Sequence, residues 1–292
     1  MVSVVNTGQT VVFFMTNQCN SNCIMCPMST GTRRSKTLIH DSNWLEECDR
    51  MNDDVYHIDI TGGEPLLEWE ELITVIEYIN RRWPRAFVQI LTNGRALCIN
   101  EIQKALKACL TDNILFAIPI HGHCKELHNA ITQSPCSFQQ TITGLEYLKA
   151  QRMRVEIRIV GQQLNEDYIL DICRLIIELK LKYVRVNLMA MEMNGNAAKN
   201  RTKLWIDYRE LYKKSEKGIK LLLLSGIDVV LYNFPLCSLP RNTWYLAKQS
   251  ITDWKVCYYD DCEKCVVKDV CCGLFKSTYL LNLYRVEPIK EE

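Results

Sequence analysis

The sequence contains no apolar run long enough to cross a bilayer. Its longest apolar runs, such as LLLL at 221–224, fall far short of the roughly 20 residues that a membrane-spanning helix needs. Residues 1–18 also lack the basic segment, the long apolar segment and the small-residue cleavage site of a secretory signal. We therefore expect a cytoplasmic protein with no membrane partner.

Neither positive nor negative charge is in excess. The 35 Lys and Arg residues nearly balance the 34 Asp and Glu residues, which leaves a formal net charge of +1. No stripe of basic and aromatic residues runs along the chain. Because nucleic-acid binding depends on a concentrated positive field, this composition argues against a nucleic-acid partner.

Cysteine, by contrast, is abundant, with 15 residues in the chain. Without a secretory signal, these thiols are expected to be reduced rather than paired in a disulfide framework. Those that stand singly are interpreted as small buried apolar side chains: Cys48, Cys98, Cys109, Cys124, Cys136 and Cys173. The others gather near the two ends of the chain, where we expect metal ligands.

Short apolar runs alternate with longer amphipathic stretches along most of the chain. The predicted strands are 10–16, 55–61, 86–92, 114–120, 154–160 and 183–189, and the predicted helices are 43–52, 68–82, 99–109, 138–150, 166–179 and 205–224. This alternation implies right-handed crossovers and a parallel sheet, so we expect an α/β fold, a partial (β/α)6 TIM-like barrel. Prolines and clustered cysteines follow residue 225. We therefore divide the chain into a barrel, 1–228, and a small C-terminal iron–sulfur extension, 229–292.

Three cysteines, Cys19, Cys23 and Cys26, follow the first predicted strand with the spacing C-x3-C-x2-C. Four thiolates close a zinc site or fill the corners of a [4Fe–4S] cube, so three thiolates would leave one iron open to a small molecule. A zinc site with a distant fourth ligand is the alternative.

The triad resembles the signature of the radical S-adenosylmethionine (radical SAM) superfamily, which lies in the loop after the first strand. The resemblance implies that S-adenosylmethionine chelates the open iron of a [4Fe–4S] cluster. It also implies that reductive cleavage, with electrons from an external donor, yields a 5′-deoxyadenosyl radical that abstracts hydrogen from a substrate.

Four further segments follow predicted strand ends as the family's motifs do: TGGEP (61–65), LTNG (91–94), RIV (158–160) and MAMEMNGNA (189–197). By resemblance, Glu64 would accept hydrogen bonds from the cofactor's amino group, and Arg158 would bind its carboxylate. A barrel-rim ion pair is the alternative for Arg158. The resemblance implies cofactor contacts at Gly62, Gly63, Glu64, Pro65, Thr92, Asn93, Arg158 and Met191.

A second group of cysteines has the spacing Cys262-x2-Cys265-x5-Cys271. It resembles the SPASM and twitch extensions of radical SAM enzymes, in which an upstream cysteine completes an auxiliary iron–sulfur site. Cys237 is the candidate for that upstream ligand. The SPASM pattern would place a further cysteine where this chain has Phe275, so we expect one auxiliary cluster, of the [4Fe–4S] type. A structural zinc is the alternative, and Cys257 and Cys272 are spare thiols.

The segment from Pro235 to CCGLF, with AKQSITDWK (247–255), resembles a narrower family, the C-type radical SAM maturases of the His-Xaa-Ser system. This resemblance implies a peptide maturase that modifies a ribosomally made peptide beside a second radical SAM maturase. Only residues 1–18 precede the first cysteine, so a separate leader-binding protein is a further expected partner. The alternative is a radical SAM enzyme acting on a nucleoside, tRNA or small metabolite.

Histidine is scarce, with five residues, and three of them (His121, His123 and His128) follow the fourth predicted strand. That position faces the mouth of the expected barrel. His121 and His123 are therefore candidate catalytic residues that could transfer a proton or bind substrate, and a polar loop is the alternative.

Overall fold

The computed structural model describes residues 4–6, 10–28, 43–250 and 255–291. It contains a nine-stranded sheet whose strands neighbour one another in chain order from β1 to β9. β1 is antiparallel to β2, and every later pair of neighbours is parallel. The strands are β1 (Val4–Asn6), β2 (Thr10–Phe14), β3 (His57–Thr61), β4 (Phe87–Leu91), β5 (Ile114–Pro119), β6 (Arg154–Val160), β7 (Tyr183–Met189), β8 (Asp228–Tyr232) and β9 (Ala247–Lys248).

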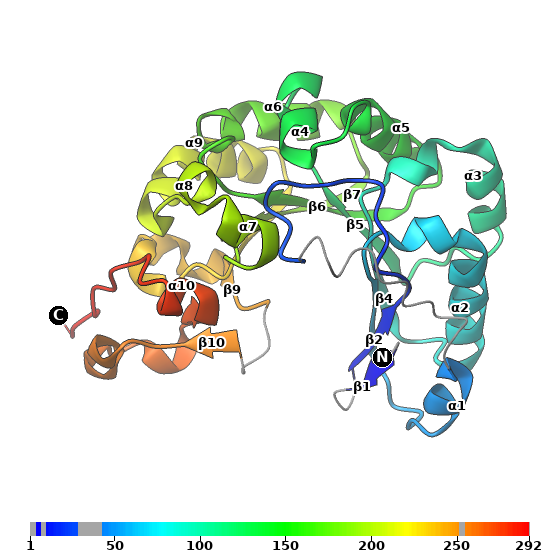
Figure 1. The fold of residues 1–292 in the computed structure, drawn as a ribbon, viewed down its shortest axis with the longest axis horizontal. Helices are drawn as coiled ribbons and strands as arrows, with labels where there is room; N and C mark the ends of the chain where they lie inside the picture. The colour runs from blue at the N-terminus through cyan, green and yellow to red at the C-terminus, as the bar shows by residue number, and fades with distance from the viewer. Residues whose placement is uncertain (1–3, 7–9, 29–42, 251–254, 292) are drawn as a thin grey trace.

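Helices connect the parallel strands and follow the outer side of the curved sheet, which gives an arch that is open on one side (Figure 1). The helices are α1 (Trp44–Asp49), α2 (Trp69–Arg82), α3 (Asn100–Lys107), α4 (Lys125–Thr132), α5 (Ser137–Ala150), α6 (Ile169–Leu179), α7 (Gly195–Lys199), α8 (Arg201–Leu204), α9 (Tyr208–Leu224) and α10 (Lys276–Leu280). In the described parts of the chain, no helix combines the length and apolarity needed to cross a membrane.

The eight parallel strands confirm the expected α/β fold, and all six predicted strands are present. The sheet is nevertheless longer than predicted, because β8 and β9 extend it beyond β7. β8 has the alternating burial of a true strand, whereas β9 is only two residues long and therefore carries no readable period. The short helices α4, α7 and α8 were likewise not predicted.

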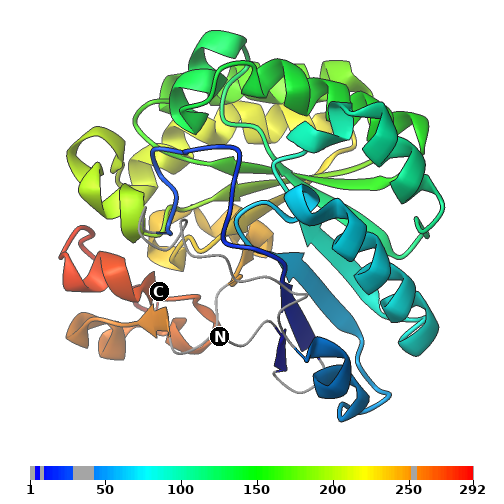
Figure 2. The ribbon, with the colours of Figure 1, turned by 45° about the vertical axis from the view of Figure 1, so that its right-hand side comes forward.

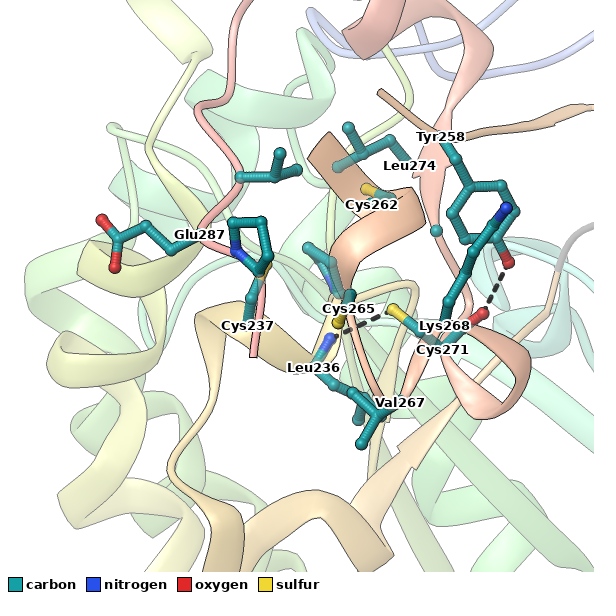
Figure 3. Close-up of a pocket in the computed structure, with 14 residues that line it drawn as sticks. Leu236, Cys237, Tyr258, Cys262, Cys265, Val267, Lys268, Cys271, Leu274 and Glu287 are labelled. Atoms are coloured by element: carbon teal, nitrogen blue, oxygen red, sulfur yellow. Dashed lines mark hydrogen bonds between the residues drawn. The ribbon is translucent and has the colours of Figure 1, made fainter. Parts of the chain in front are cut away.

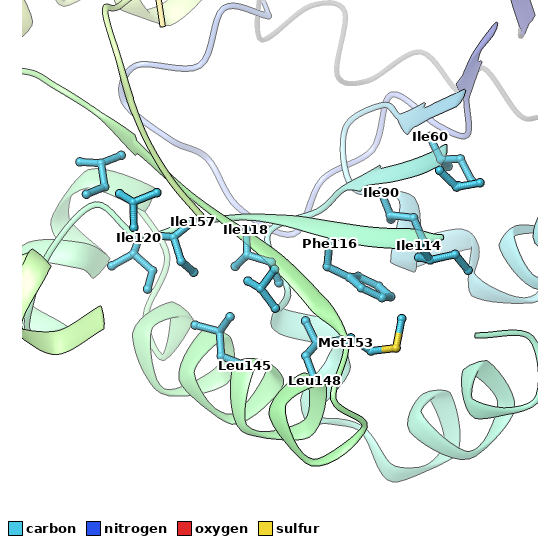
Figure 4. Packing of buried hydrophobic residues seen from close by; sticks show 14 of the residues in the cluster. Ile60, Ile90, Ile114, Phe116, Ile118, Ile120, Leu145, Leu148, Met153 and Ile157 are labelled. Atoms are coloured by element: carbon cyan, nitrogen blue, oxygen red, sulfur yellow. The ribbon is translucent and has the colours of Figure 1, made fainter. Parts of the chain in front are cut away.

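The main core lies between the sheet and the outer helices (Figure 4). Alternate residues of the central strands point toward the helices, and Phe116, Ile118 and Ile157 pack in the same cluster as Leu145 and Leu148 of α5. All five are completely buried. Each such side chain contributes roughly 1.5–3 kcal/mol by leaving water, so this layer fixes the curvature and register of the arch.

The concave face of the sheet is unusually polar. Gln89, Glu156 and Asn187 are buried there, since residues of opposite alternation on the same strands form the helix-facing core. Parallel sheets are normally apolar on both faces. This face is therefore available for polar groups rather than for a second helical layer.

The C-terminal segment forms a small unit of its own beside the arch, around the antiparallel strands β10 (Val256–Cys257) and β11 (Leu274–Phe275). Figures 1 and 2 both place this unit at the β9 end of the sheet, near α7. The division of the chain at residue 228 stays a prediction, and β8 and β9, which lie at or beyond that residue, belong to the main sheet.

Candidate functional site

The loop that carries the first cysteines, 15–28, is joined to the turn after β3. The N–H of Gly63 donates to the carbonyl of Thr16, and the N–H of Glu64 donates to the carbonyl of Gln18 at 2.8 Å. A Cβ atom at Gly62 or Gly63 would overlap these same carbonyl oxygens. The two glycines therefore permit a close approach of the turn to the cysteine loop.

A second attachment of the loop comes from the end of α4. The N–H groups of Asn22 and Ile24 donate to the carbonyls of Thr132 and Ile131, at 3.0 and 2.9 Å. The last carbonyls of a helix have no hydrogen-bond donors within the helix, and here the N–H groups of the loop are the donors. The cysteine loop is thus held in register along the last turn of α4.

The third attachment comes from α7 and the residue that follows it. The backbone N–H of Asn196 donates to the Cys26 carbonyl at 2.9 Å, and its side-chain amide donates to the Cys23 carbonyl at 3.3 Å. The Asn200 amide donates to the Ile24 carbonyl at 3.1 Å. Asn196 lies within the segment MAMEMNGNA (189–197) that the sequence analysis named, but the role of either asparagine left no signal, because their partners are backbone atoms far away in the chain.

Arg95 is the fourth attachment, and the sequence analysis also missed it. Its guanidinium donates to the Asn20 carbonyl and, at 3.0 Å, to the Ser21 hydroxyl. Its Nε donates to the Gln140 carboxamide at 2.7 Å. Arg95 is buried, and its position directly after the LTNG turn was the only available signal.

The three thiols of the loop are partly exposed and are not in disulfides. The N–H of Ser21 approaches the Cys19 sulfur at 3.4 Å, and the Asn93 amide approaches it at 3.9 Å. The attachments described above use mainly the backbone of the loop, and the role of Cys19, Cys23 and Cys26 as ligands stays a prediction.

The carboxylate of Glu64 has three hydrogen-bond donors within the chain, and its expected contact with the cofactor amino group stays a prediction. Its carboxylate accepts hydrogen bonds from the Thr92 hydroxyl, the Asn93 N–H (2.7 Å) and the Leu66 N–H (3.0 Å). The side chain is 1% exposed, and burial raises the pKa of Glu64 although these hydrogen bonds oppose the shift. Glu64 therefore joins the turns after β3 and β4, and Pro65 begins the short 3-10 helix behind it.

Arg158 lies on the concave face near the end of β6. Its Nε donates to Glu156 at 2.7 Å, and Gln89 donates to the same carboxylate oxygen at 3.2 Å. Register places Arg158 opposite Asn187 of β7, whose carboxamide is buried without a hydrogen-bond partner in the described parts of the chain. The ion pair that was the alternative role for Arg158 is therefore present, with Glu156 as its partner. A role of Arg158 toward the cofactor stays a prediction.

Met191 is buried in a small apolar cluster separate from the main core. Its neighbours in that cluster include Met25 of the cysteine loop, Ile131 of α4 and Met193. This packing supports the loop from the side of α7. Its predicted contact with the cofactor remains untested.

His121 and His123 follow β5, as predicted. His121 is 2% exposed, and its N–H donates to Nδ1 of His128 at 3.3 Å. Burial, and next the neighbouring His128, lower the pKa of His121 to about 3, so it is neutral near pH 7. His123 stacks on Tyr168, with ring centroids 5.4 Å apart. Nδ1 of each candidate is buried without a hydrogen-bond partner among the described residues.

The second group of cysteines lines one pocket (Figure 3). Cys262, Cys265 and Cys271 come from the segment between β10 and β11, and Cys237 reaches the pocket from the short helix η6 (Leu236–Ser238) that follows β8. The N–H of Leu236 donates to the Cys271 sulfur at 3.4 Å. Tertiary structure therefore brings together the four thiols that the sequence analysis grouped.

The two spare thiols are absent from the residues that line this pocket. Cys272 is buried, and its thiol donates to the carbonyl of Phe234 at 3.1 Å. Cys257 lies on β10. In the described ranges, no three His, Cys, Asp or Glu side chains stand close enough to hold a metal ion as they are.

Comparison with known proteins places this arrangement in a family. The model of the Radical SAM superfamily matches residues 13–176. An uncharacterized protein of Methanocaldococcus jannaschii is 23% identical over 181 residues, which cover 61% of this chain and 62% of that protein. An AdoMet-dependent heme synthase of Methanosarcina barkeri is 26% identical over 152 residues, 51% of this chain and 41% of the synthase. The chain thus matches less than two thirds of the length of either relative.

Two solved structures share the fold. anSMEcpe with bound AdoMet and Kp18Cys peptide aligns with a TM-score of 0.56 and 17% identity, over 75% of this chain and 62% of that chain. Streptococcus suis SuiB bound to S-adenosylmethionine aligns with a TM-score of 0.56 and 14% identity, over 77% of this chain and 47% of that chain.

Proposed function

This chain belongs to the radical SAM superfamily, and we propose that it is a peptide maturase that modifies a ribosomally made peptide. The family implies S-adenosylmethionine and a [4Fe–4S] cluster as cofactors. When bound, they supply a 5′-deoxyadenosyl radical for hydrogen abstraction. The cofactors carry out the radical chemistry, so the residues of the chain bind and orient the cofactors and the substrate and exclude water.

The first cysteine loop fits a cluster with one open iron. Cys19, Cys23 and Cys26 are soft ligands of the kind that iron–sulfur clusters use. Four separate attachments hold the backbone of their loop. Beside it, Asn93 and Arg158 would contact the cofactor, and Glu64 with Thr92 would hold the two turns that face it.

The pocket at Cys237, Cys262, Cys265 and Cys271 fits an auxiliary iron–sulfur cluster of the SPASM or twitch type. Four thiols satisfy all four corners of a cube, in contrast to the three of the first loop. The auxiliary cluster would pass an electron or anchor the substrate. The His-Xaa-Ser assignment, a second maturase, a leader-binding protein and an external electron donor form part of the same proposal.

The observation that carries the peptide assignment is the combination of a four-thiol pocket with a barrel shaped like that of anSMEcpe, which was solved with a bound peptide. On the polar concave face, the carboxamide of Asn187 would offer a donor and an acceptor to a peptide backbone. His121 and His123 border that region as neutral or stacked rings and are the candidates for substrate contact.

Anaerobic reconstitution followed by reduction tests this function. We expect release of 5′-deoxyadenosine from S-adenosylmethionine, and a mass change in a peptide encoded by a small neighbouring gene. Reconstituted clusters that never cleave the cofactor would contradict the enzyme assignment. Cleavage without any change in such peptides would contradict the substrate assignment alone.

A second candidate is a radical SAM enzyme that acts on a small metabolite, which the similarity to the heme synthase supports. The two candidates differ in what should stimulate cofactor cleavage. A small-molecule extract freed of peptides by filtration would stimulate cleavage by a metabolite enzyme, whereas a peptide maturase would respond only to the peptide fraction.

A further inference from the structure

One short segment, 192–200, contacts both the first cysteine loop and the C-terminal unit that carries the second group of cysteines. It follows β7 and contains α7, and Figure 1 places it between the first cysteine loop and the C-terminal unit. Its contacts in the two directions are made by different residues. They can therefore be separated by mutation.

Toward the first site, the contacts are hydrogen bonds to the cysteine loop itself. Asn196 is 7% exposed and donates to the carbonyls of Cys23 and Cys26, the two residues that bound the C-x2-C turn. The preceding Gly195 has φ +55°, and a Cβ there would overlap the Pro27 carbonyl. The segment and the loop are thus fitted against each other at backbone distance.

Toward the second site, the contacts reach the C-terminal unit. The N–H of Met193 donates to the Ser277 hydroxyl of α10 at 3.1 Å. Glu192 forms an ion pair with Lys255 at 3.2 Å, just before β10. Neither partner lines the four-thiol pocket itself, but each lies within three residues of one that does, since Leu274 precedes Ser277 and Tyr258 follows Lys255.

Apolar packing joins the same three parts independently of these hydrogen bonds. Met25 of the cysteine loop and Met193 of the segment share one small cluster, and Leu283, which follows α10, packs against it. Met193 is 1% exposed and Met25 is 7% exposed. A displacement of α10 would therefore be felt at Met25 as well as at Asn196, because close-packed interiors transmit strain.

We propose that segment 192–200 couples the two cysteine sites, with Asn196 as its positioning residue. Filling the four-thiol pocket would fix α10 and β10, hold Met193 and Glu192 in place, and so order the loop of Cys23 and Cys26. The coupling is reciprocal, since two binding events that share one support must favour each other equally. The proposal rests on the proposed function in that it takes both sites to bind iron–sulfur clusters.

Hydrogen exchange measured by mass spectrometry tests this coupling in the full chain. Replacing Cys19, Cys23 and Cys26 by alanine confines added iron and sulfide to the second pocket. We expect reconstitution of this variant to slow amide exchange in loop 20–27 about tenfold. Ser277→Ala, which removes the acceptor of the Met193 N–H, should abolish that protection, whereas the exposed neighbour substitution Lys276→Ala should preserve it. Iron uptake without any change in the loop would overturn the proposal.

A second arm needs no cluster and separates this proposal from the proposed function. In the metal-free chain with its cysteines intact, Asn196→Ala and Ser277→Ala should each accelerate exchange in loop 20–27 about tenfold. The matched control is Lys199→Ala, at an exposed position of the same segment. If the pocket takes up no iron, the assignment of an auxiliary cluster is wrong. This arm would still show whether segment 192–200 holds loop 20–27 in place. Unchanged amide exchange in both variants would refute the role of segment 192–200 in holding loop 20–27.

Discussion

The Thr92 hydroxyl donates a hydrogen bond to the buried carboxylate of Glu64, and this bond joins the turn after β3 to the turn after β4. The same turns contact the first cysteine loop through Gly63 and Asn93. Glu64, whose contact with the cofactor stays a prediction, therefore also holds these two turns of the site together.

Thr92→Val tests this link between the turns. The substitution keeps the shape of the side chain but removes the hydroxyl that donates to Glu64 and accepts from the Gly94 N–H at 3.0 Å, which should lower the free energy of unfolding by about 1–3 kcal/mol. Urea denaturation measures this loss. Thr143→Val, on the exposed face of α5, is the control and should change stability by less than about 0.5 kcal/mol. Equal effects at the two positions would contradict the role of Thr92.

Arg95→Lys should loosen the cysteine loop without unfolding the chain. A lysine ammonium cannot reproduce the planar fork that reaches Asn20, Ser21 and Gln140 together. We expect faster amide exchange at residues 20–21 and less iron at the first site after reconstitution. Arg85→Lys, at an exposed position, should match the parent chain in both measurements.

The adjacent pair Cys271 and Cys272 offers a matched test of the second pocket. Cys271 lines the pocket, whereas the Cys272 thiol donates to the Phe234 carbonyl. With two cubes per chain, about eight irons are expected, and replacing Cys262 and Cys265 with alanine should remove about four of them. Cys271→Ala should impair the same cluster, and Cys272→Ala should retain it. Iron and sulfide analysis after anaerobic reconstitution decides between these outcomes, and parallel loss in both single variants would argue against the assigned ligand set.

His121 should make stability depend on pH below neutrality. Burial lowers its pKa from 6.5 to about 3, so between these values the unfolded chain binds a proton that the folded chain does not. This contribution is fully present above pH 6.5 and is lost as the pH falls toward 3, at about 1.4 kcal/mol per pKa unit. His121→Gln should flatten that part of the curve of unfolding free energy against pH. Gln163→Asn, at an exposed position without a titratable group, should leave the slope in place.

Much of the fold was readable because strands and helices leave different periods in the sequence. The strands from β2 to β7 carry β-branched and apolar residues in runs bounded by turn residues, and the matching helices carry an apolar stripe. β9, with two residues, and α7, with five, are too short to repeat the period of a strand or a helix. Their positions depend on partners in the sheet and in the cysteine loop.

The candidate site was only partly readable for a related reason. Cysteine spacing identifies ligands because thiols that bind one centre recur at short intervals. Asn196 and Arg95 leave no such pattern, since they donate to carbonyls that every residue type possesses. Asn196 reaches the Cys23 carbonyl across 173 positions, and Arg95 reaches Asn20 across 75.

The sequence alone determined that three thiols would follow the first parallel strand and that others would gather near the C-terminus, because both facts reside in local spacing. Only the tertiary structure decided that Cys237 joins Cys262, Cys265 and Cys271 in one pocket, while Cys272, one residue further on, lies outside it. The reason is geometric. Which thiols share a pocket depends on backbone direction and on packing with distant segments, and neither is encoded in the spacing of the cysteines.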